Sequence, residues 1–156
     1  MDHQENGMTF DYDIGVDGLK RWFNVDGSRR YYSDGSRRWY DDNGDLHRDG
    51  GPAVVFDNGD KKWYQYGLLD RFDGPAVEEA DGFKAWFRNG LRHRDDGPAI
   101  EGVNGEMLWY CDGLLHREDG PAVIESDGET LWYHHGKFIR NPGTVKDLVD
   151  KLKRCV

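Results

Sequence analysis

The chain has 156 residues, of which 37% are hydrophobic and 13% aromatic, and its net charge at pH 7 is −9. This length fits one domain or one short array of repeats, and the acidic balance disfavours non-specific binding to nucleic acid or to an anionic membrane. No apolar run approaches the ~20 residues of a membrane span. The two cysteines, Cys111 and Cys155, stand in no metal-type or disulfide pattern. We therefore expect a cytoplasmic protein with free thiols and no membrane contact, in the host cytoplasm if its source is a virus.

The N-terminal segment, residues 1–16, is polar, and residues 1–18 hold five acidic residues and no lysine or arginine. From residue 17 onward, Asp-Gly and Asn-Gly dipeptides alternate with short aromatic and β-branched segments. Such dipeptides favour two-residue hairpin loops of type I′, in which both central residues need a positive φ. The pattern predicts an antiparallel β-meander over residues 17–143 that follows the polar segment.

Four segments of the first half share one pattern of two cations followed by two aromatic residues: 20–23, 29–32, 37–40 and 61–64. If the turns at 26–27 and 34–35 have two residues, Trp22 faces Tyr31, and Tyr31 faces Arg38. Interleaved arginines and aromatic rings suit stacking on nucleotides or contact with an acidic partner. The competing interpretation is a solvated sheet face whose cations pair with nearby aspartates. The candidate binding residues in these rows are Arg21, Trp22, Arg30, Tyr32, Arg37 and Trp39.

A longer motif then returns every 23 residues: Trp-aromatic, a Gly turn, His-Arg and Gly-Pro-Ala. The tryptophans at this period are Trp63, Trp86, Trp109 and Trp132, and the arginines are Arg48, Arg71, Arg94, Arg117 and Arg140. A fixed period of this kind indicates a repeat architecture, in which one unit buries its apolar surface against the next. Within one unit we expect a strand at 53–56, a turn at 57–60, a returning strand at 61–66 and a connection at 68–75.

The C-terminal segment, residues 144–156, has a different pattern. Thr144 can cap a helix, and apolar residues follow at helical spacing: Val145, Leu148, Val149 and Leu152. An amphipathic helix there would cover the open end of the array, with partner binding as its alternative role. The predicted fold class is therefore all-β, an elongated single-layer meander of hairpin repeats with a C-terminal capping helix.

The repeated Trp-aromatic pairs, the turn glycines Gly67, Gly90, Gly113 and Gly136, and the Leu-His-Arg-x-Asp-Gly-Pro-Ala stretch at 115–122 resemble the MORN repeat, especially its bacterial and viral variants. The resemblance covers residues 39–142, with a degenerate extension back to residue 17. The Gly-Pro-Ala element departs from a standard MORN unit. The resemblance implies an extended antiparallel sheet that serves as an interaction platform. Members of such families have been linked to lipid contact, to scaffolding and to antitoxin-like roles.

No residue pattern nominates an enzyme. The triplet His47-Arg48-Asp49 is similar to the catalytic loop of protein kinases, but it recurs as a repeat element and lacks the phosphate loop that kinases need. His47, His93 and His116 occupy one repeat position, and successive units should lie about 10 Å apart. Because zinc ligands must all reach one ion at about 2 Å, we expect no shared metal in this column. His134-His135 is a lone adjacent pair, so we expect no metal site elsewhere either, and we predict no cofactor.

The recurring arginines have two possible roles. Arg71, Arg94 and Arg117 each precede an Asp-Gly-Pro, which favours a guanidinium that ties the loop together through carboxylate or carbonyl contacts. The alternative role is a ladder that binds phosphates or carboxylates.

Residues 63–156 carry twelve Lys/Arg against seventeen Asp/Glu. This excess of acid predicts a non-enzymatic protein-binding module, such as a small acidic inhibitor of the antitoxin, anti-defence or anti-CRISPR type. Its partner would be another protein, for example a nucleic-acid-binding one with a basic channel. Direct nucleotide or nucleic-acid binding by residues 20–40 is the alternative, and no pattern points to a particular oligomeric state. The acidic candidates for partner contact are Glu78, Glu79, Glu101 and Glu125.

Overall fold

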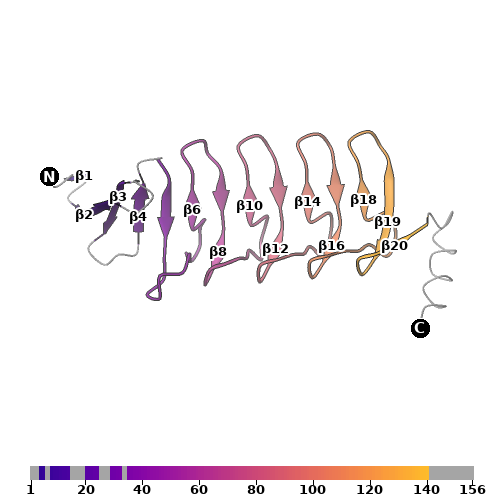
Figure 1. Ribbon diagram of the computed structural model, residues 1–156, viewed down its shortest axis with the longest axis horizontal. Coiled ribbons are helices and arrows are strands. Elements are labelled where there is room, and N and C mark those ends of the chain that lie inside the picture. Colours follow the sequence, from indigo (N-terminus) through magenta and orange to yellow (C-terminus); the bar gives the residue numbers. More distant parts are fainter. Residues whose placement is uncertain (1–3, 6–7, 15–19, 25–28, 33–34, 141–156) are drawn as a thin grey trace.

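The computed structural model describes residues 4–5, 8–14, 20–24, 29–32 and 35–140, with side chains for residues 14, 32 and 35–140. These residues form an all-β structure with one open antiparallel sheet of 14 strands and three separate two-stranded hairpins. Strand order in the long sheet follows chain order, so the sheet grows in one direction, and Figure 1 shows the resulting elongated array. The helix expected over residues 144–156 lies outside the described residues. No described segment forms a helix that could cross a membrane.

The first five strands are β1 (Gln4–Glu5), β2 (Met8–Ile14), β3 (Lys20–Asn24), β4 (Arg29–Tyr32) and β5 (Arg37–Trp39). The repeat units continue the same sheet with β6 (Val54–Val55), β7 (Lys61–Lys62), β10 (Val77–Glu78), β11 (Lys84–Ala85), β14 (Ile100–Glu101), β15 (Met107–Leu108), β18 (Val123–Ile124), β19 (Thr130–His134) and β20 (Lys137–Ile139). The separate hairpins pair β8 (Tyr64–Gln65) with β9 (Leu68–Leu69), β12 (Phe87–Arg88) with β13 (Leu91–Arg92), and β16 (Tyr110–Cys111) with β17 (Leu114–Leu115). The sheet begins before residue 17, because β2 pairs with β3 along five residues.

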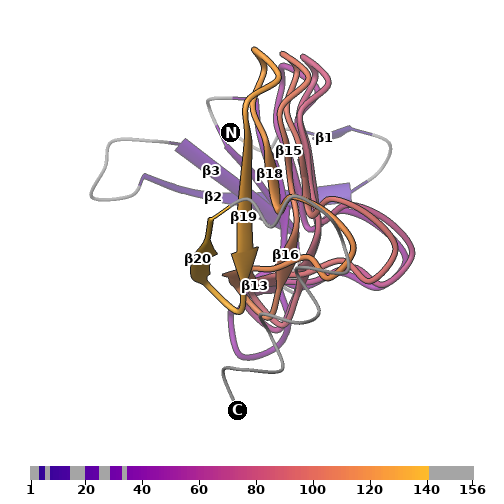
Figure 2. The ribbon, with the colours of Figure 1, turned by 90° about the vertical axis from the view of Figure 1, so that its right-hand side faces the viewer.

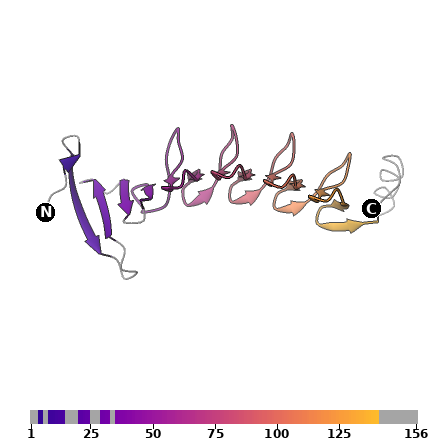
Figure 3. The same cartoon turned by 90° about the horizontal axis from the view of Figure 1, so that it is seen from above.

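Each repeat unit contains two hairpins where the sequence predicted one. The expected returning strand at 61–66 divides at Trp63, whose N–H donates to Ala76 O at 2.8 Å and whose carbonyl accepts from the Asp70 N–H at 3.2 Å. Residues after this tryptophan leave the long sheet and pair with the Leu68–Leu69 strand instead. The second hairpins form their own row below the long sheet (Figures 1 and 2). Figure 3 shows the connections between units projecting to one side.

Most of the Asp-Gly and Asn-Gly turns differ from the predicted two-residue type. In the loop after Phe56, the Asp60 carbonyl accepts the Phe56 N–H at 2.9 Å, so three residues separate the strands and only Gly59 has a positive φ, 97°. The preceding Asn58 uses its side-chain oxygen to accept the Asp60 N–H at 3.1 Å. This Asx bond explains why Asn or Asp precedes the glycine. The two-residue prediction is correct at 89–90 and 112–113, where both residues have positive φ.

The N-terminal register is confirmed in one hairpin and wrong in the next. Trp22 lies opposite Tyr31, as predicted. Tyr31 then lies opposite Arg37 and not Arg38. The shift arises because the Tyr32 N–H donates to Ser36 O, which makes this loop three residues long as well. One extra loop residue moves each partner by one position along the strand.

The core is narrow and consists mainly of the residues that follow each Gly-Pro. Its fully buried members are Ala53, Ala76, Ala99 and Ala122, and the aliphatic residues after them are at most 7% exposed. Near the centre, Val77, Ala85 and Ile100 pack together, with Phe87 and Leu69 of the second hairpins against them. Such a thin core depends on contact between neighbouring units, as in other repeat proteins.

Candidate functional site

The repeated arginine binds within its own unit. The Arg94 guanidinium lies 3.9 Å from the Trp86 ring centroid, which is a cation–π contact. Its Nε donates to Asp96 at 2.9 Å, and its Nη1 donates to Pro98 O at 3.2 Å and to Glu101 at 2.8 Å. The Nε and Nη1 donors of this guanidinium are thus directed at the protein itself.

The other units repeat this arrangement. The further arginine–tryptophan contacts, at 4.0 to 4.1 Å, are Arg48 on Trp39, Arg71 on Trp63 and Arg117 on Trp109. A Cβ added at Gly97 would lie 3.0 Å from the Arg94 guanidinium carbon, so the glycine of Gly-Pro-Ala leaves room for the guanidinium. In these four units the contacts support the structural role of the arginines over a ligand-binding ladder.

These contacts divide the four acidic candidates into two pairs. Glu78 and Glu101 form ion pairs with Arg71 and Arg94 and are about one-third exposed. Their strand neighbours add opposite charge, since Lys84 lies between them in the sheet register. Glu79 and Glu125 instead follow the ends of strands β10 and β18, each directly before a three-residue hairpin loop. The four residues therefore do not form one continuous acidic row.

The alternative Arg/aromatic rows contain residues with different exposure. Tyr32 is buried at 6% exposure, and its hydroxyl lies 2.8 Å from that of Tyr40. Trp39 is covered on one ring face by Arg48, and its indole is the first member of the tryptophan column. Arg37 is exposed and lies opposite Val55. For the remaining three candidates, Arg21, Trp22 and Arg30, the structure describes the backbone alone, in strands β3 and β4.

Grooves open between successive Arg-x-Asp-Gly-Pro loops. The groove between the Arg94 and Arg117 loops has a volume of about 450 Å³ and is lined by His93, Asp95, Trp109, Cys111, His116 and Glu118, among others. His93, one of its lining residues, is only 8% exposed. The lining is rich in carboxylates and lacks a large apolar floor, so the groove is suited to polar or cationic groups of a partner.

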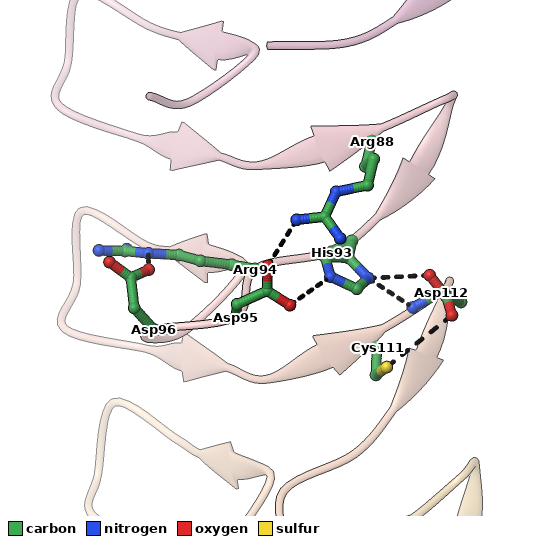
Figure 4. Close-up of polar contacts among 7 residues, drawn as sticks. All are labelled: Arg88, His93, Arg94, Asp95, Asp96, Cys111 and Asp112. Carbon is green, nitrogen blue, oxygen red and sulfur yellow. Dashed lines mark hydrogen bonds and ion pairs between the residues drawn. The ribbon is translucent and has the colours of Figure 1, made fainter. Parts of the chain in front are cut away.

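His93 is held by two carboxylates. Its Nε2 lies 2.8 Å from Asp95 and its Nδ1 lies 2.9 Å from Asp112 (Figure 4). Asp95 also accepts a hydrogen bond from Arg88 at 2.5 Å, and this guanidinium, with His93, lowers the pKa of the Asp95 carboxyl. Together these four side chains connect two neighbouring units.

Cys111 lies beside this cluster, but its surroundings disfavour a reactive thiolate. Burial and the adjacent Asp112 raise the pKa of the Cys111 thiol. A nucleophilic cysteine needs the opposite shift, usually from a nearby cation. The cluster therefore offers binding groups rather than an activated nucleophile.

The side chain at the His93 position has the same structural role in four units. In each, it accepts the backbone N–H of the first turn residue of the next second-row hairpin, 19 positions further on. This side chain and the residues 18 and 19 positions after it form a group of three, which we call the repeat corner. The four repeat corners are His47–Gln65–Tyr66, Asp70–Arg88–Asn89, His93–Cys111–Asp112 and His116–His134–His135.

Two repeat corners contain three side chains of metal-ligand type, with one ligand atom of each within 4.8 Å of the others: His93–Cys111–Asp112 and His116–His134–His135. Neither cluster combines two of the histidines at positions 47, 93 and 116. The sequence analysis missed these clusters, because the 18- and 19-residue separations acquire meaning only when the second hairpin and its register are known.

The comparisons with known proteins add no relationship. No protein-family model matches the chain, and no curated protein matches its sequence.

Proposed function

We propose that this protein is a non-enzymatic binding module of MORN-like repeats that inhibits a partner protein by occupying a basic surface. The observation that carries the proposal is the unequal exposure of its charges. The guanidinium side chains of Arg71, Arg94 and Arg117 are 21 to 25% exposed, whereas the aspartates that they bind, Asp73, Asp96 and Asp119, are 79 to 84% exposed. Acidic groups thus face the solvent once per unit while their cations lie against tryptophan.

The surrounding residues support a protein as the partner. Residues 63–140 contain fifteen Asp/Glu against eight Lys/Arg, so this part of the array is attracted to a basic surface. Phe72 is 99% exposed at the tip of its loop, at the position that holds Asp49 and Asp95 in other units. An exposed aromatic ring of this kind can serve as an anchor in a protein interface.

The experiment is affinity capture from lysate of the native host, with low-salt and high-salt washes and analysis of the eluate for protein and nucleic acid. We expect one stoichiometric protein whose binding weakens in high salt, because long-range charge attraction is screened. Recovery of nucleic acid alone would overturn the proposal.

Site-directed variants then locate the contact. Glu79→Lys with Glu125→Lys should weaken partner binding and reduce its salt dependence, and the Gln versions should have a smaller effect. These two positions are preferable to Glu78 and Glu101, because reversing the latter would also break the ion pairs with Arg71 and Arg94. Unchanged affinity and salt dependence in the Lys variants would exclude these glutamates as contacts.

The alternative function, nucleotide or nucleic-acid binding by the Arg/aromatic rows, is supported by the exposed Arg37. The burial of Tyr32 and the Arg48 contact on Trp39 reduce the ring surface that could stack on bases. Titration of labelled single strands and nucleotides against Arg30→Ala and Arg37→Ala tests it. Equal weak binding by parent and variants would remove this alternative.

A further inference from the structure

The last repeat corner brings three histidines together. His134 ends β19, and His135 is the first residue of the following turn. The His116 ring stacks on His135 at 4.2 Å between centroids and meets His134 edge-on at 4.6 Å. One nitrogen from each ring lies within 4.8 Å of the other two. We propose that His116, His134 and His135 bind a divalent transition-metal ion of the zinc class.

Binding of one ion by all three histidines requires a local rearrangement of their rings. Tetrahedral zinc with Zn–N bonds of about 2.0 Å places its ligand nitrogens roughly 3.3 Å apart. The three nitrogens must therefore approach one another by about 1.5 Å at most. The His116 and His135 rings, now stacked at an interplanar angle of 16°, must also turn so that the plane of each ring contains the ion. Three imidazoles would leave a fourth position for water or for a group of a partner.

The charges around this corner favour a cation. Burial and the neighbouring histidines lower the pKa values of His116 and His134 below that of a free imidazole. Glu118 is the carboxylate near both rings, and its negative charge raises their pKa values. A carboxylate beside ligating histidines commonly supports a metal site from its outer shell.

Metal binding would have one structural consequence at His135. The Nδ1 atom of His116 now accepts the His135 N–H at 3.2 Å. If Nδ1 binds the metal, it can no longer accept this bond. If Nε2 binds the metal, the remaining proton of the neutral ring moves to Nδ1, with the same result. The His135 amide is therefore released in either case.

Other repeat corners explain why the site is assigned here. The corners at His47 and Asp70 lack three ligand side chains. The His93 corner has them, but the Nε2 atom of His93 lies 2.8 Å from the carboxylate of Asp95, which is outside the cluster, and its Nδ1 atom accepts the Asp112 N–H at 3.1 Å. The His47 corner has the same ring stack with Tyr66 in place of His135, at 4.3 Å. It shows that a tyrosine fits the turn position that the last corner gives to histidine.

The test uses the full chain, produced without a polyhistidine tag and treated with a chelator, in calorimetric titration with Zn²⁺. We expect about one equivalent to bind. The variant His134→Gln/His135→Tyr reproduces the side chains of the His47 corner and so preserves the stack. We expect it to lose more affinity than the about 10- to 100-fold that removal of an outer-shell group costs.

Two control variants and a second measurement complete the test. His47→Ala and Cys111→Ser should bind zinc as the parent does, and circular dichroism should show all variants folded. Amide exchange at His135 should accelerate when zinc is added to the parent. Absence of zinc binding, retention of full affinity in the double variant, or loss of binding in Cys111→Ser would each overturn the proposal.

Discussion

At the scale of single residues, the repeat motif is explained by one arginine. Arg94 needs the Trp86 ring on one side, the absence of a side chain at Gly97 on the other, and acceptors at Asp96 and Pro98. The motif elements Trp, Arg, Asp and Gly-Pro are thus parts of one packed group. Their recurrence follows from structure, independently of any ligand.

Replacing this arginine should destabilise the protein. Arg94→Ala removes a cation–π contact and three hydrogen bonds, and we expect a loss of about 1–3 kcal/mol in the free energy of unfolding. Arg92→Ala is the matched control, because Arg92 is exposed and lies 5.4 Å from the Tyr110 centroid. We expect less than about 0.5 kcal/mol for the control. Urea unfolding of both variants measures the difference, and equal losses would refute the assigned role of Arg94.

The glycine beside Arg94 should be coupled to it. Gly97→Ala places a Cβ 3.0 Å from the guanidinium carbon of Arg94. Displacing this guanidinium should lower the free energy of unfolding by about 1–2 kcal/mol. The same change in an Arg94→Ala background should cost little, because the obstacle is gone. A double-mutant cycle by urea unfolding measures the coupling. Additive effects would show that the glycine has another purpose.

The arginine-bound carboxylates should make stability depend on acid. Hydrogen bonds from Arg71, Arg88 and Arg117 lower the pKa values of Asp73, Asp95 and Asp119 below their ordinary 3.8. Groups with a lowered folded-state pKa stabilise the fold above the ordinary value, and this stabilisation is lost as pH falls through the folded pKa. Unfolding midpoints should therefore decline below about pH 4. The triple variant Asp73→Asn/Asp95→Asn/Asp119→Asn should show a shallower decline of the unfolding midpoint with falling pH. An unchanged slope would show that these three carboxylates are not its cause.

At the scale of elements, turn geometry determines how each unit is divided. Three-residue loops with one left-handed glycine join the strands of the long sheet, whereas two-residue turns close the second hairpins. In those second turns a non-glycine residue takes a positive φ, such as Asn89 at 49°. Asp70 accepts the Asn89 N–H at 2.7 Å, so the turn is also attached to the preceding unit.

Substitution at this turn should separate backbone strain from contact. Asn89→Val should lower the free energy of unfolding by about 1–2 kcal/mol, because a β-branched residue tolerates the left-handed region poorly. Asn89→Gly should remain close to the parent, since glycine adopts this conformation without steric cost. Thermal and urea unfolding provide the comparison. Similar losses in both variants would point to the Asn89 side chain and not to its backbone.

At the scale of the whole molecule, the long sheet determines an extended shape. Fourteen strands at a spacing of about 4.8 Å extend over roughly 60 Å. Each unit contacts mainly its neighbours, and the exposed acidic groups recur along this length. An extended, rigid surface of this kind suits contact with another macromolecule better than enclosure of a small ligand.

Solution scattering should report this shape directly. A compact domain of this length would have a radius of gyration of about 15 Å. We expect a clearly larger value, about 20 Å or more, with a distance distribution skewed as for a rod. High salt should leave the value unchanged, because backbone pairing and burial hold the sheet. A value near that of a compact domain would contradict the extended sheet.

Part of the candidate site could be read from the sequence. The 23-residue period identified the tryptophan and arginine columns and predicted the local carboxylate contacts of Arg71, Arg94 and Arg117. Trp39 is not in the 23-residue series of tryptophans, because the loop before Asp45 has one residue more than the corresponding turns of the later units. The contacts of Glu78 and Glu101 with the arginine column were also missed, since they depend on how a loop folds back on the sheet.

The sequence by itself determined the all-β class, the repeat and its phase, because residue type and spacing control which backbone conformations and which buried faces are available. Tertiary structure decided the second row of hairpins, the strand register and the clustering of His116, His134 and His135. These depend on hydrogen bonds between neighbouring units, such as that from the His135 N–H to His116. A change of one residue in a loop redirects such bonds without altering the local pattern, which is why spacing alone could not reveal them.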